Sequence, residues 1–186
     1  RELSGFGSGK SFPGIHRALA RKLAYPALSV AYYLPTYDLV TRMGMPRFQE
    51  ELERLGVPFR ANHADAYITV DSGGQIIFRT MDNPARIVAY QVADSIADEI
   101  DTLPTDKAWQ VWNKIIARNR QKKPDGAINT VGIVTTPEGF RFVYERWQKL
   151  PAAGYRLSRA STYSNAANLP SGYLDSLRAS YPANLV

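Results

Sequence analysis

The 186-residue sequence predicts one α/β domain, with a mainly parallel central sheet flanked by helices. Apolar runs of strand length alternate with stretches of helical periodicity along most of the chain. This alternation indicates a parallel sheet, because consecutive parallel strands require a crossover that is usually a helix. A glycine-rich stretch, SGFGSGKS at residues 4–11, directly precedes the first predicted helix and indicates a phosphate-binding loop.

The first part of the chain contains a helix, a buried strand and a second helix. Ile15, Leu19 and Leu23 recur at four-residue spacing and predict that the first helix packs on the core. The apolar run 27–34 predicts a buried strand that ends before a proline. Residues 38–55 predict a helix that ends before a glycine.

The remaining elements continue the alternation. Two short alternating runs on either side of residues 71–74 predict a β-hairpin. The next helix is predicted by five apolar residues at helical spacing: Ala108, Val111, Trp112, Ile115 and Ile116. After it come a predicted strand and turn in 129–139, a helix at 140–150, a strand at 155–161 and a short helix at 171–181.

Composition narrows the class of protein. Hydrophobic residues make up 45% of the chain and charged ones 22%, and no apolar run reaches the roughly 20 residues of a membrane span. The absence of cysteine excludes disulfides, and the two histidines, His16 and His63, lie too far apart to suggest a zinc site. A net charge of +6 suits a polyanionic partner such as DNA. We therefore expect a soluble cytoplasmic protein with no membrane partner.

The glycine-rich stretch carries the residue types that hold nucleotide phosphates. In the pattern G-x-x-x-x-G-K-[ST], glycines let backbone N–H groups turn toward the phosphates, the lysine reaches the β- and γ-phosphates, and the final hydroxyl ligates Mg²⁺. The second half of the pattern is present, and a serine replaces the first glycine. A frayed, flexible terminus is the alternative. The residues expected to contact the nucleotide are Gly5, Phe6, Gly7, Ser8, Gly9, Lys10 and Ser11.

Nucleotide hydrolysis also needs an acidic pair at a strand end, one carboxylate to hold Mg²⁺ and one to activate the attacking water. The segment SIADEID provides Asp98 and Glu99 for these roles. The run before them contains Asp94 and Ser95, although a buried strand is normally apolar, so an acidic pair on a surface helix is the alternative. The alternating pattern and the preceding phosphate loop favour hydrolysis.

A pair of hydroxyl residues, Thr135 and Thr136, directly follows the apolar run of the next predicted strand. Their hydroxyl groups are placed to contact the γ-phosphate or the attacking water and so to report the state of the nucleotide. An ordinary turn is the alternative, since Thr-Pro and Glu-Gly are common loop dipeptides.

The order of these motifs resembles the ATPase domain of large terminase subunits, the DNA-packaging motors of tailed bacteriophages. The resemblance runs from Ser4 to about Leu177, and DNPARI and TTPEGF are its most specific segments. It implies an ASCE-type P-loop NTPase that uses ATP and Mg²⁺. It also implies a homo-oligomeric ring of five subunits, docked with the small terminase subunit on the portal of the procapsid in the host cytoplasm, which drives double-stranded DNA inward.

The resemblance also implies residue roles. Many family members have an arginine in the phosphate loop where this chain has Phe6, so the transition state needs a cation from elsewhere. Arg86 resembles the arginine that a neighbouring subunit inserts, and Arg79 is the second candidate; a solvated surface arginine is the alternative for either. The other implied roles are Lys10 for phosphate charge, Ser11 and Asp98 for Mg²⁺, Glu99 as catalytic base, and Thr135 and Thr136 for coupling.

Two departures from the family bear on domain organisation. The segment that contacts adenine upstream of the loop and the C-terminal nuclease are both missing, so we expect residues 1–186 to be a truncated ATPase domain, weak or inactive alone. Another P-loop DNA translocase or helicase, and an inert assembly or DNA-binding fragment, remain alternatives. DNA contact is expected at four basic residues, for which a solvated helix end is the alternative: Arg118, Arg120, Lys122 and Lys123.

Overall fold

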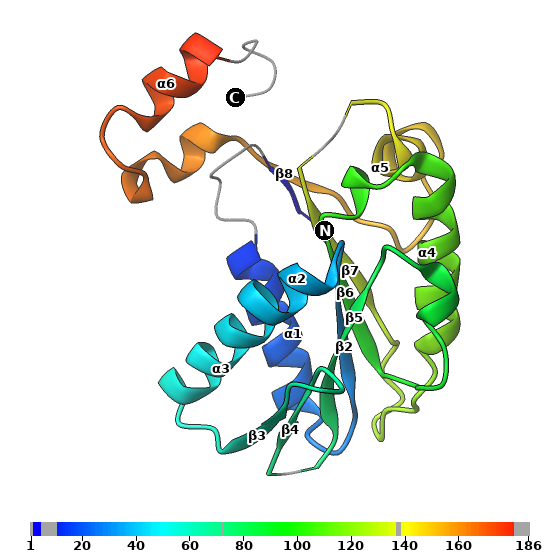
Figure 1. Cartoon of the computed structure of the whole chain (residues 1–186). Coiled ribbons are helices and arrows are strands. Elements are labelled where there is room, and N and C mark those ends of the chain that lie inside the picture. The colour runs from blue at the N-terminus through cyan, green and yellow to red at the C-terminus, as the bar shows by residue number, and fades with distance from the viewer. Residues whose placement is uncertain (1, 5–10, 72, 137–138, 181–186) are drawn as a thin grey trace.

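The computed structural model describes residues 2–4, 11–71, 73–136 and 139–180. In this part of the chain an eight-stranded sheet has the order β3-β4-β5-β2-β6-β7-β1-β8 (Figure 1). The strands are β1 (Glu2–Ser4), β2 (Val30–Leu34), β3 (Phe59–Asn62), β4 (Tyr67–Val70), β5 (Gln75–Thr80), β6 (Asp94–Asp98), β7 (Val131–Thr135) and β8 (Ser158–Ala160). The α-helices are α1 (Ser11–Ala24), α2 (Tyr37–Leu39), α3 (Met45–Arg54), α4 (Thr105–Arg118), α5 (Phe142–Tyr144) and α6 (Tyr173–Ser180).

The sheet is mainly parallel, as predicted. Strands β5, β2, β6, β7, β1 and β8 run parallel to one another. At the other edge of the sheet, β4 pairs antiparallel with both β5 and β3. Because the parallel strands point the same way, their carboxyl ends lie along one edge of the sheet. That edge is where ligands bind in open α/β sheets.

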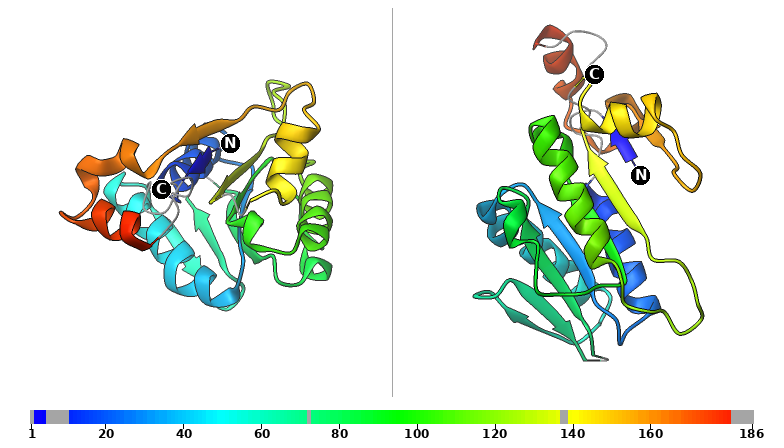
Figure 2. Two further views of the ribbon diagram at one scale, coloured as in Figure 1. Left: turned by 90° about the horizontal axis from the view of Figure 1, so that it is seen from above. Right: turned by 90° about the vertical axis from the view of Figure 1, so that its right-hand side faces the viewer.

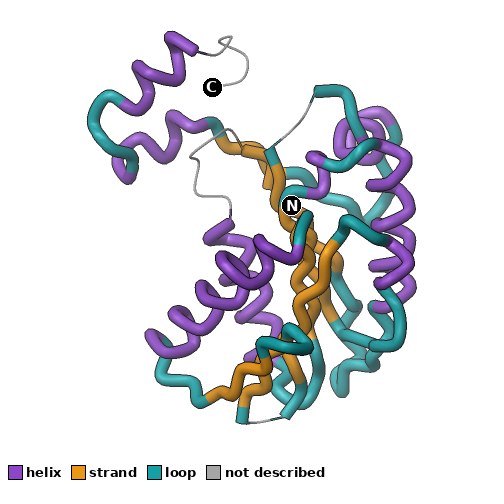
Figure 3. Tube along the Cα trace, viewed as in Figure 1, coloured by secondary structure: helices purple, strands orange, loops and turns teal. Residues whose placement is uncertain are grey.

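Helices cover both faces of the sheet (Figures 1 and 3). Helices α1, α2 and α3 lie on one face and α4 and α5 on the other. Strand β2 shows the consequence, because Val30, Tyr32 and Leu34 pack toward α1 and α3. The alternate residues Ala31 and Tyr33 pack toward α4. A strand buried on both faces has no polar side, which explains its continuous apolar run.

The C-terminal residues lie apart from this two-faced core. After β8 the chain forms a 3₁₀ helix (Thr162–Asn168) and then α6, and Figure 2 shows both beyond the end of the sheet. Among the helices in the described part of the chain, none is long and apolar enough to cross a membrane.

The predicted hairpin is confirmed by β4 and β5, which pair antiparallel. Its turn depends on Gly74, whose φ of 61° lies in the left-handed region that glycine adopts without strain. A Cβ atom at this position would also collide with the carbonyl oxygen of Leu28. The turn therefore requires glycine for two independent reasons.

The predicted apolar face of α1 is wrong at its last position. Ile15 and Leu19 are buried, but Leu23 is 36% exposed, and Lys22 is fully buried instead. Residues eight apart on a helix differ by about 80° around the axis, whereas residues seven apart differ by about 20°. Lys22 therefore continues the line of Ile15 into the core.

Other predicted elements differ in their boundaries. The strand expected at 27–34 begins at Val30, and the helix expected at 38–55 consists of α2, a π-helical turn (Val40–Gly44) and α3. The helix expected at 140–150 is α5 followed by a π-helical turn (Glu145–Lys149). Strand β3 and the 3₁₀ helix Thr162–Asn168 were not predicted, and Ile116 is exposed.

The buried Lys22 should make stability depend on pH. Its ammonium donates to the carbonyl oxygens of Pro26 and Gly73, and burial lowers the pKa of Lys22 to about 8 from 10.5. Between pH 8 and 10.5, Lys22 has released its proton in the folded chain but still holds it in the unfolded chain. Folding therefore becomes more favourable as pH rises. Relative to Lys22→Met, we expect the wild type to gain on the order of 1 kcal/mol or more of unfolding free energy from pH 8 to 10.5.

Urea unfolding of both proteins between pH 7 and 11 measures this difference. Subtracting the variant removes the titration of the tyrosines, which both proteins share. A difference that stays constant or shrinks through this window would contradict the assignment.

Candidate active site

The predicted acidic and hydroxyl residues meet at the carboxyl ends of two neighbouring strands. Asp98 ends β6 and pairs in register with Val134 of β7, one residue before Thr135. Because the strands are parallel and adjacent, the residues that follow each of them lie side by side. The structure therefore brings Asp98, Glu99, Thr135 and Thr136 together at one edge of the sheet.

Asp98 is fully buried beneath this edge. Its Oδ2 accepts a hydrogen bond of 2.8 Å from the hydroxyl of Tyr32, which belongs to β2 on the other side of β6. Burial and the nearby Asp98 carboxylate raise the pKa of Tyr32 well above its usual value, so the phenol keeps its proton. The phenol thus fixes the direction of a carboxylate whose oxygens are the ligand type that Mg²⁺ prefers.

Glu99 leaves the strand in a left-handed conformation, with φ of 59°. This conformation costs a non-glycine residue about 1 kcal/mol or more. Its N–H donates to the carbonyl of Val134 at 2.8 Å, and its carbonyl accepts from the hydroxyl of Thr102 at 2.7 Å. These bonds hold the turn that redirects the Glu99 side chain toward β7.

The Glu99 carboxylate contacts the hydroxyl pair directly. Its Oε2 lies 3.0 Å from the N–H of Thr136 and 3.2 Å from the hydroxyl of Thr135, and both groups can donate to it. The Thr135 hydroxyl also lies 3.1 Å from the carbonyl oxygen of Thr136. Glu99 and the hydroxyl pair therefore form one hydrogen-bonded unit.

Helix α1 begins at Ser11, the last residue of the predicted phosphate loop. A Cβ atom at Gly14, one turn later, would lie 3.3 Å from the Tyr32 hydroxyl and 2.9 Å from a methyl of Val134. Glycine thus lets the start of α1 approach β7 and the tyrosine that bonds Asp98, and no acidic residue in its first turn opposes an anion. The other loop residues lie outside the described part of the chain: Gly5, Phe6, Gly7, Ser8, Gly9 and Lys10.

The polar residues inside β6 have hydrogen-bond or ion-pair partners. Lys123 Nζ lies 2.9 and 2.8 Å from the two oxygens of Asp94, and Thr130 donates to Asp94 from both its N–H and its hydroxyl at 2.7 Å. Ser95 donates to Asn119. These contacts explain how a fully buried strand accommodates Asp94 and Ser95, and they remove the objection to placing the acidic pair at its end.

The expectation that Lys123 contacts DNA is wrong. Its side chain is only 5% exposed, pairs with Asp94 and donates to the carbonyl of Ile128 at 3.0 Å. Arg118 is half-buried, so Arg120 and Lys122 are the exposed members of the basic run. Alternation along an extended segment accounts for this, because every second side chain points inward.

The two candidate arginines differ in their surroundings. Arg79 donates to the carbonyl oxygens of Phe78 and Asp65, at 2.6 and 3.0 Å, and stacks over Tyr90. Arg86 is exposed at the end of the 3₁₀ turn Pro84–Arg86, and its guanidinium has no hydrogen bond or ion pair with the described residues. Arg86 is therefore the freer of the two to reach a neighbouring molecule.

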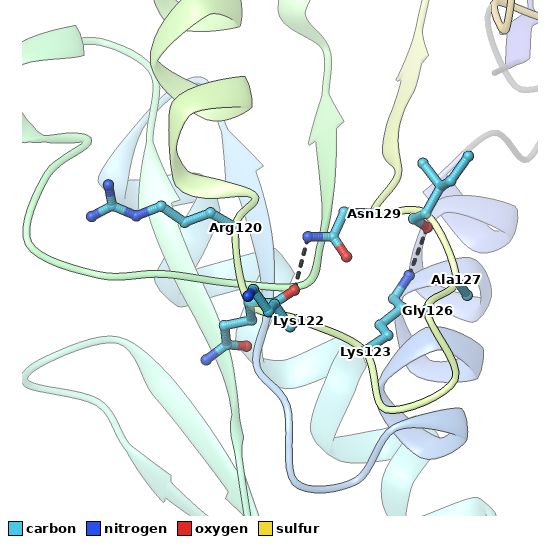
Figure 4. Close-up of a pocket in the computed structure, with 8 residues that line it drawn as sticks. Arg120, Lys122, Lys123, Gly126, Ala127 and Asn129 are labelled. Atoms are coloured by element: carbon cyan, nitrogen blue, oxygen red, sulfur yellow. Dashed lines mark hydrogen bonds between the residues drawn. The ribbon is translucent and has the colours of Figure 1, made fainter.

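A basic hollow lies at the opposite edge of the sheet, in the loop between α4 and β7 (Figure 4). It encloses about 400 Å³, and its lining includes Arg120, Lys122 and Lys123. The amide of Asn129 donates to the carbonyls of Asn119 and Gln121 at 3.1 and 2.9 Å, which fixes the loop. The exposed cations thus project from a well-defined backbone.

Two residues of the site were not predicted. Tyr32 reads in the sequence as an ordinary core residue of an apolar strand. Asp101, two residues beyond the acidic pair, is buried and bonded to both Thr135 and Val143. The sequence did contain a signal for Asp101, because an aspartate in a segment that leads back into the core requires a partner for its buried carboxylate.

A family model described as the N-terminal part of the T4likevirus-type terminase large subunit matches residues 3–185. No curated protein sequence matches the chain.

Solved structures with a similar fold come from phage packaging proteins. The large terminase ATPase domain of Thermus phage P74-26 is 17% identical, with a TM-score of 0.65 over 98% of this chain and 83% of that one. A large terminase from a thermophilic bacteriophage is 15% identical, with a TM-score of 0.72 over 98% of this chain but 45% of that one, and it has also been solved with ADP and with ATP-γ-S. The N-terminal domain of the phi29 DNA-packaging ATPase is 10% identical, with a TM-score of 0.54 over 83% of this chain and 82% of that one.

Proposed function

Because the chain belongs to the T4likevirus-type family of large terminase subunits, we propose that residues 1–186 form the ATPase domain of a DNA-packaging motor. The observation that carries the proposal is the hydrogen-bonded unit of Glu99, Thr135 and Thr136 beside the buried Asp98 and the start of α1. This edge supplies a metal-binding carboxylate, a base and a helix N-terminus, the three elements that phosphoryl transfer to water requires.

Each residue has a separate task in this proposal. Ser11 and Asp98 would hold Mg²⁺, whose charge lowers the cost of the negative charge that develops on the phosphates. Lys10 would balance the charge of the β- and γ-phosphates. Glu99 would orient the attacking water and accept its proton.

The coupling pair would sense whether nucleotide is bound. Thr135 and Thr136 contact the carboxylate of Glu99, at 3.2 and 3.0 Å. A γ-phosphate that accepts hydrogen bonds from the same two donors would release Glu99 toward the water. The hydroxyl pair would then link binding of ATP to activation of the base.

Nucleotide binding tests the metal site without requiring turnover. We expect ATP-γ-S to bind more tightly with Mg²⁺ than without it, and Asp98→Asn to lose roughly tenfold of that enhancement. Asparagine still accepts the Tyr32 hydrogen bond, so the site should keep its shape. Titration calorimetry with and without Mg²⁺ measures the effect, and equal Mg²⁺ dependence in both proteins would remove Asp98 from the metal site.

The motor would act on double-stranded DNA as a ring of the five subunits that the resemblance implies. The ring would work at the portal of a procapsid in the host cytoplasm, with the small terminase subunit as a partner. We place DNA contact at Arg120 and Lys122, which project from the fixed loop at the edge of the sheet opposite the nucleotide site. Neither side chain has a hydrogen bond or ion pair with the described residues. Both cations are thus available to phosphates.

Salt dependence tests this surface. Each phosphate contact contributes about 0.9 to the slope of log affinity against log salt, so Arg120→Ala with Lys122→Ala should reduce the slope by about 2. The matched control is Lys114→Ala with Lys149→Ala, which removes the same charge from other exposed positions. If both double variants change the slope equally, the loop has no special role.

A further inference from the structure

Asp101 connects the candidate site to the helical segment that follows the coupling pair. It lies in the 3₁₀ turn Ile100–Thr102, and its side chain has no solvent exposure. Its backbone N–H donates to the hydroxyl of Thr135 at 3.3 Å. Its carboxylate Oδ1 accepts the N–H of Val143 at 2.9 Å. Asp101 thus contacts Thr135, which precedes the loop after β7, and Val143, which follows that loop.

The Asp101 carboxylate caps the N-terminus of α5, although Asp101 itself lies outside that helix. Val143 lies in the first turn of α5, where N–H groups have no partner within the helix. The local N-cap residue, Arg141, makes no side-chain capping bond, and its guanidinium instead lies 3.4 Å from the carbonyl oxygen of Asp101. A carboxylate is the favoured partner at a helix N-terminus, so Asp101 fixes where α5 begins.

The segment that Asp101 caps is firmly packed. Phe142 is fully buried and meets Trp109 of α4 edge-to-face, with 4.9 Å between ring centroids. Trp147, in the π-helical turn that continues α5, meets Trp112 in the same way at 5.3 Å. Because these rings interlock with α4, a shift at the first turn of α5 cannot be absorbed locally.

We propose that Asp101 is a positioning residue that sets Thr135, and through it the Glu99 carboxylate, relative to the segment from Phe142 to Lys149. Movement of the hydroxyl pair at the nucleotide site and movement of this segment are then one event. The inference rests on the proposed ATPase function. Asp101 does not touch the reacting atoms; it acts through the hydroxyl of Thr135.

Steady-state ATP hydrolysis by the intact protein tests the proposal. In Asp101→Ala, we expect kcat to fall about tenfold or more, because small displacements of catalytic groups have large effects on rate. The KM for ATP should stay within about twofold, since the expected effect is on the position of the catalytic groups and not on nucleotide binding. Asp101→Asn keeps the acceptor for Val143 and should restore kcat to within about threefold of wild type.

Two comparisons separate positioning from simple stabilisation. Asp106→Ala removes an exposed acidic residue from the first turn of α4, away from the site, and should leave kcat unchanged. Adding Asp101→Ala to Thr135→Ala should lower kcat no further than Thr135→Ala alone, because each change breaks one link of the same path from Thr135 through Asp101 to Val143. Multiplicative losses, or equal kcat in the alanine and asparagine variants, would overturn the proposal.

The Lys10→Ala variant distinguishes failure of this inference from failure of the proposed function. If Lys10→Ala hydrolyses ATP like the wild type, the proposed function fails. If Lys10→Ala is inactive while Asp101→Ala keeps wild-type kcat, only the role of Asp101 fails. Should Asp101→Ala not fold, Asp101→Ser replaces it, because its shorter side chain fits the site without reaching Val143, and wild-type kcat in that variant would equally refute the role.

Discussion

Replacing Glu99 with glutamine is expected to slow ATP hydrolysis by roughly 10²- to 10⁴-fold while leaving ATP binding within about twofold of wild type. Glutamine keeps an oxygen that accepts the bonds from Thr135 and Thr136, so the turn and the hydroxyl pair should stay in place. What it loses is the ability to take a proton from water. Single-turnover hydrolysis and ATP-γ-S binding measure the two quantities separately.

Glu145→Gln is the matched control for this substitution. Glu145 is also half-buried and accepts one hydrogen bond, from the indole N–H of Trp109 at 3.2 Å, but it lies on the face of the sheet that α4 covers. We expect this variant to retain wild-type turnover. Normal turnover in Glu99→Gln would show that another group is the base.

Loss of Arg86 is expected to reduce hydrolysis by about 10³-fold or more, the usual contribution of an arginine that stabilises transition-state charge. Arg86 is exposed on the turn after β5, and the 3₁₀ turn that carries it packs against α4, on the face of the sheet opposite α1. From this position we expect Arg86 to stabilise transition-state charge in the nucleotide site of the next subunit in a ring. ATP hydrolysis by Arg86→Ala in the assembled protein measures the loss.

Mixed rings test whether this arginine acts between subunits. Glu99→Gln subunits keep Arg86 but lack the base, whereas Arg86→Ala subunits keep the base. In a random equal mixture, half of the sites carry the base and half of their neighbours carry the arginine, so up to about a quarter of wild-type activity should return. Arg79→Ala is the control, because Arg79 is bound to backbone carbonyls of its own subunit and should show no such rescue. No recovery with Arg86→Ala would place the finger elsewhere.

The strand-end residues of the site were predictable from the sequence. Thr135 and Thr136 come at the end of an apolar run, and Asp98 and Glu99 come at the end of a predicted strand despite its two polar residues. Parallel strands place such residues along one edge. To predict the contact between the Glu99 carboxylate and Thr136, one further fact was required, namely that β6 and β7 are neighbours in the sheet. Chain order does not reveal which strands are neighbours, and β1, the first strand, inserts between β7 and β8.

The errors arose where a distant partner decides burial. Lys123 looked like a solvent-facing cation because its partner, Asp94, lies in a strand that precedes α4. Lys22 looked unlike a core residue because the carbonyls that receive its ammonium belong to Pro26 and the hairpin turn. Asp101 was missed for the same reason, because its partner Val143 follows β7 in the chain and meets Asp101 only in the folded structure. Local sequence patterns predict which face of a helix or strand is buried and where a strand ends. They do not predict which distant residues tertiary packing brings together.

The measurement that tests the account most directly is ATP hydrolysis per subunit by the intact protein, with Mg²⁺ and DNA, over a wide range of protein concentration. The Lys10→Ala variant is measured beside it. We predict a rate per subunit that rises with concentration, because each site is completed by the arginine of a neighbour, and that disappears in Lys10→Ala. A rate equal to that of Lys10→Ala at every concentration would contradict the claim that this edge of the sheet hydrolyses ATP.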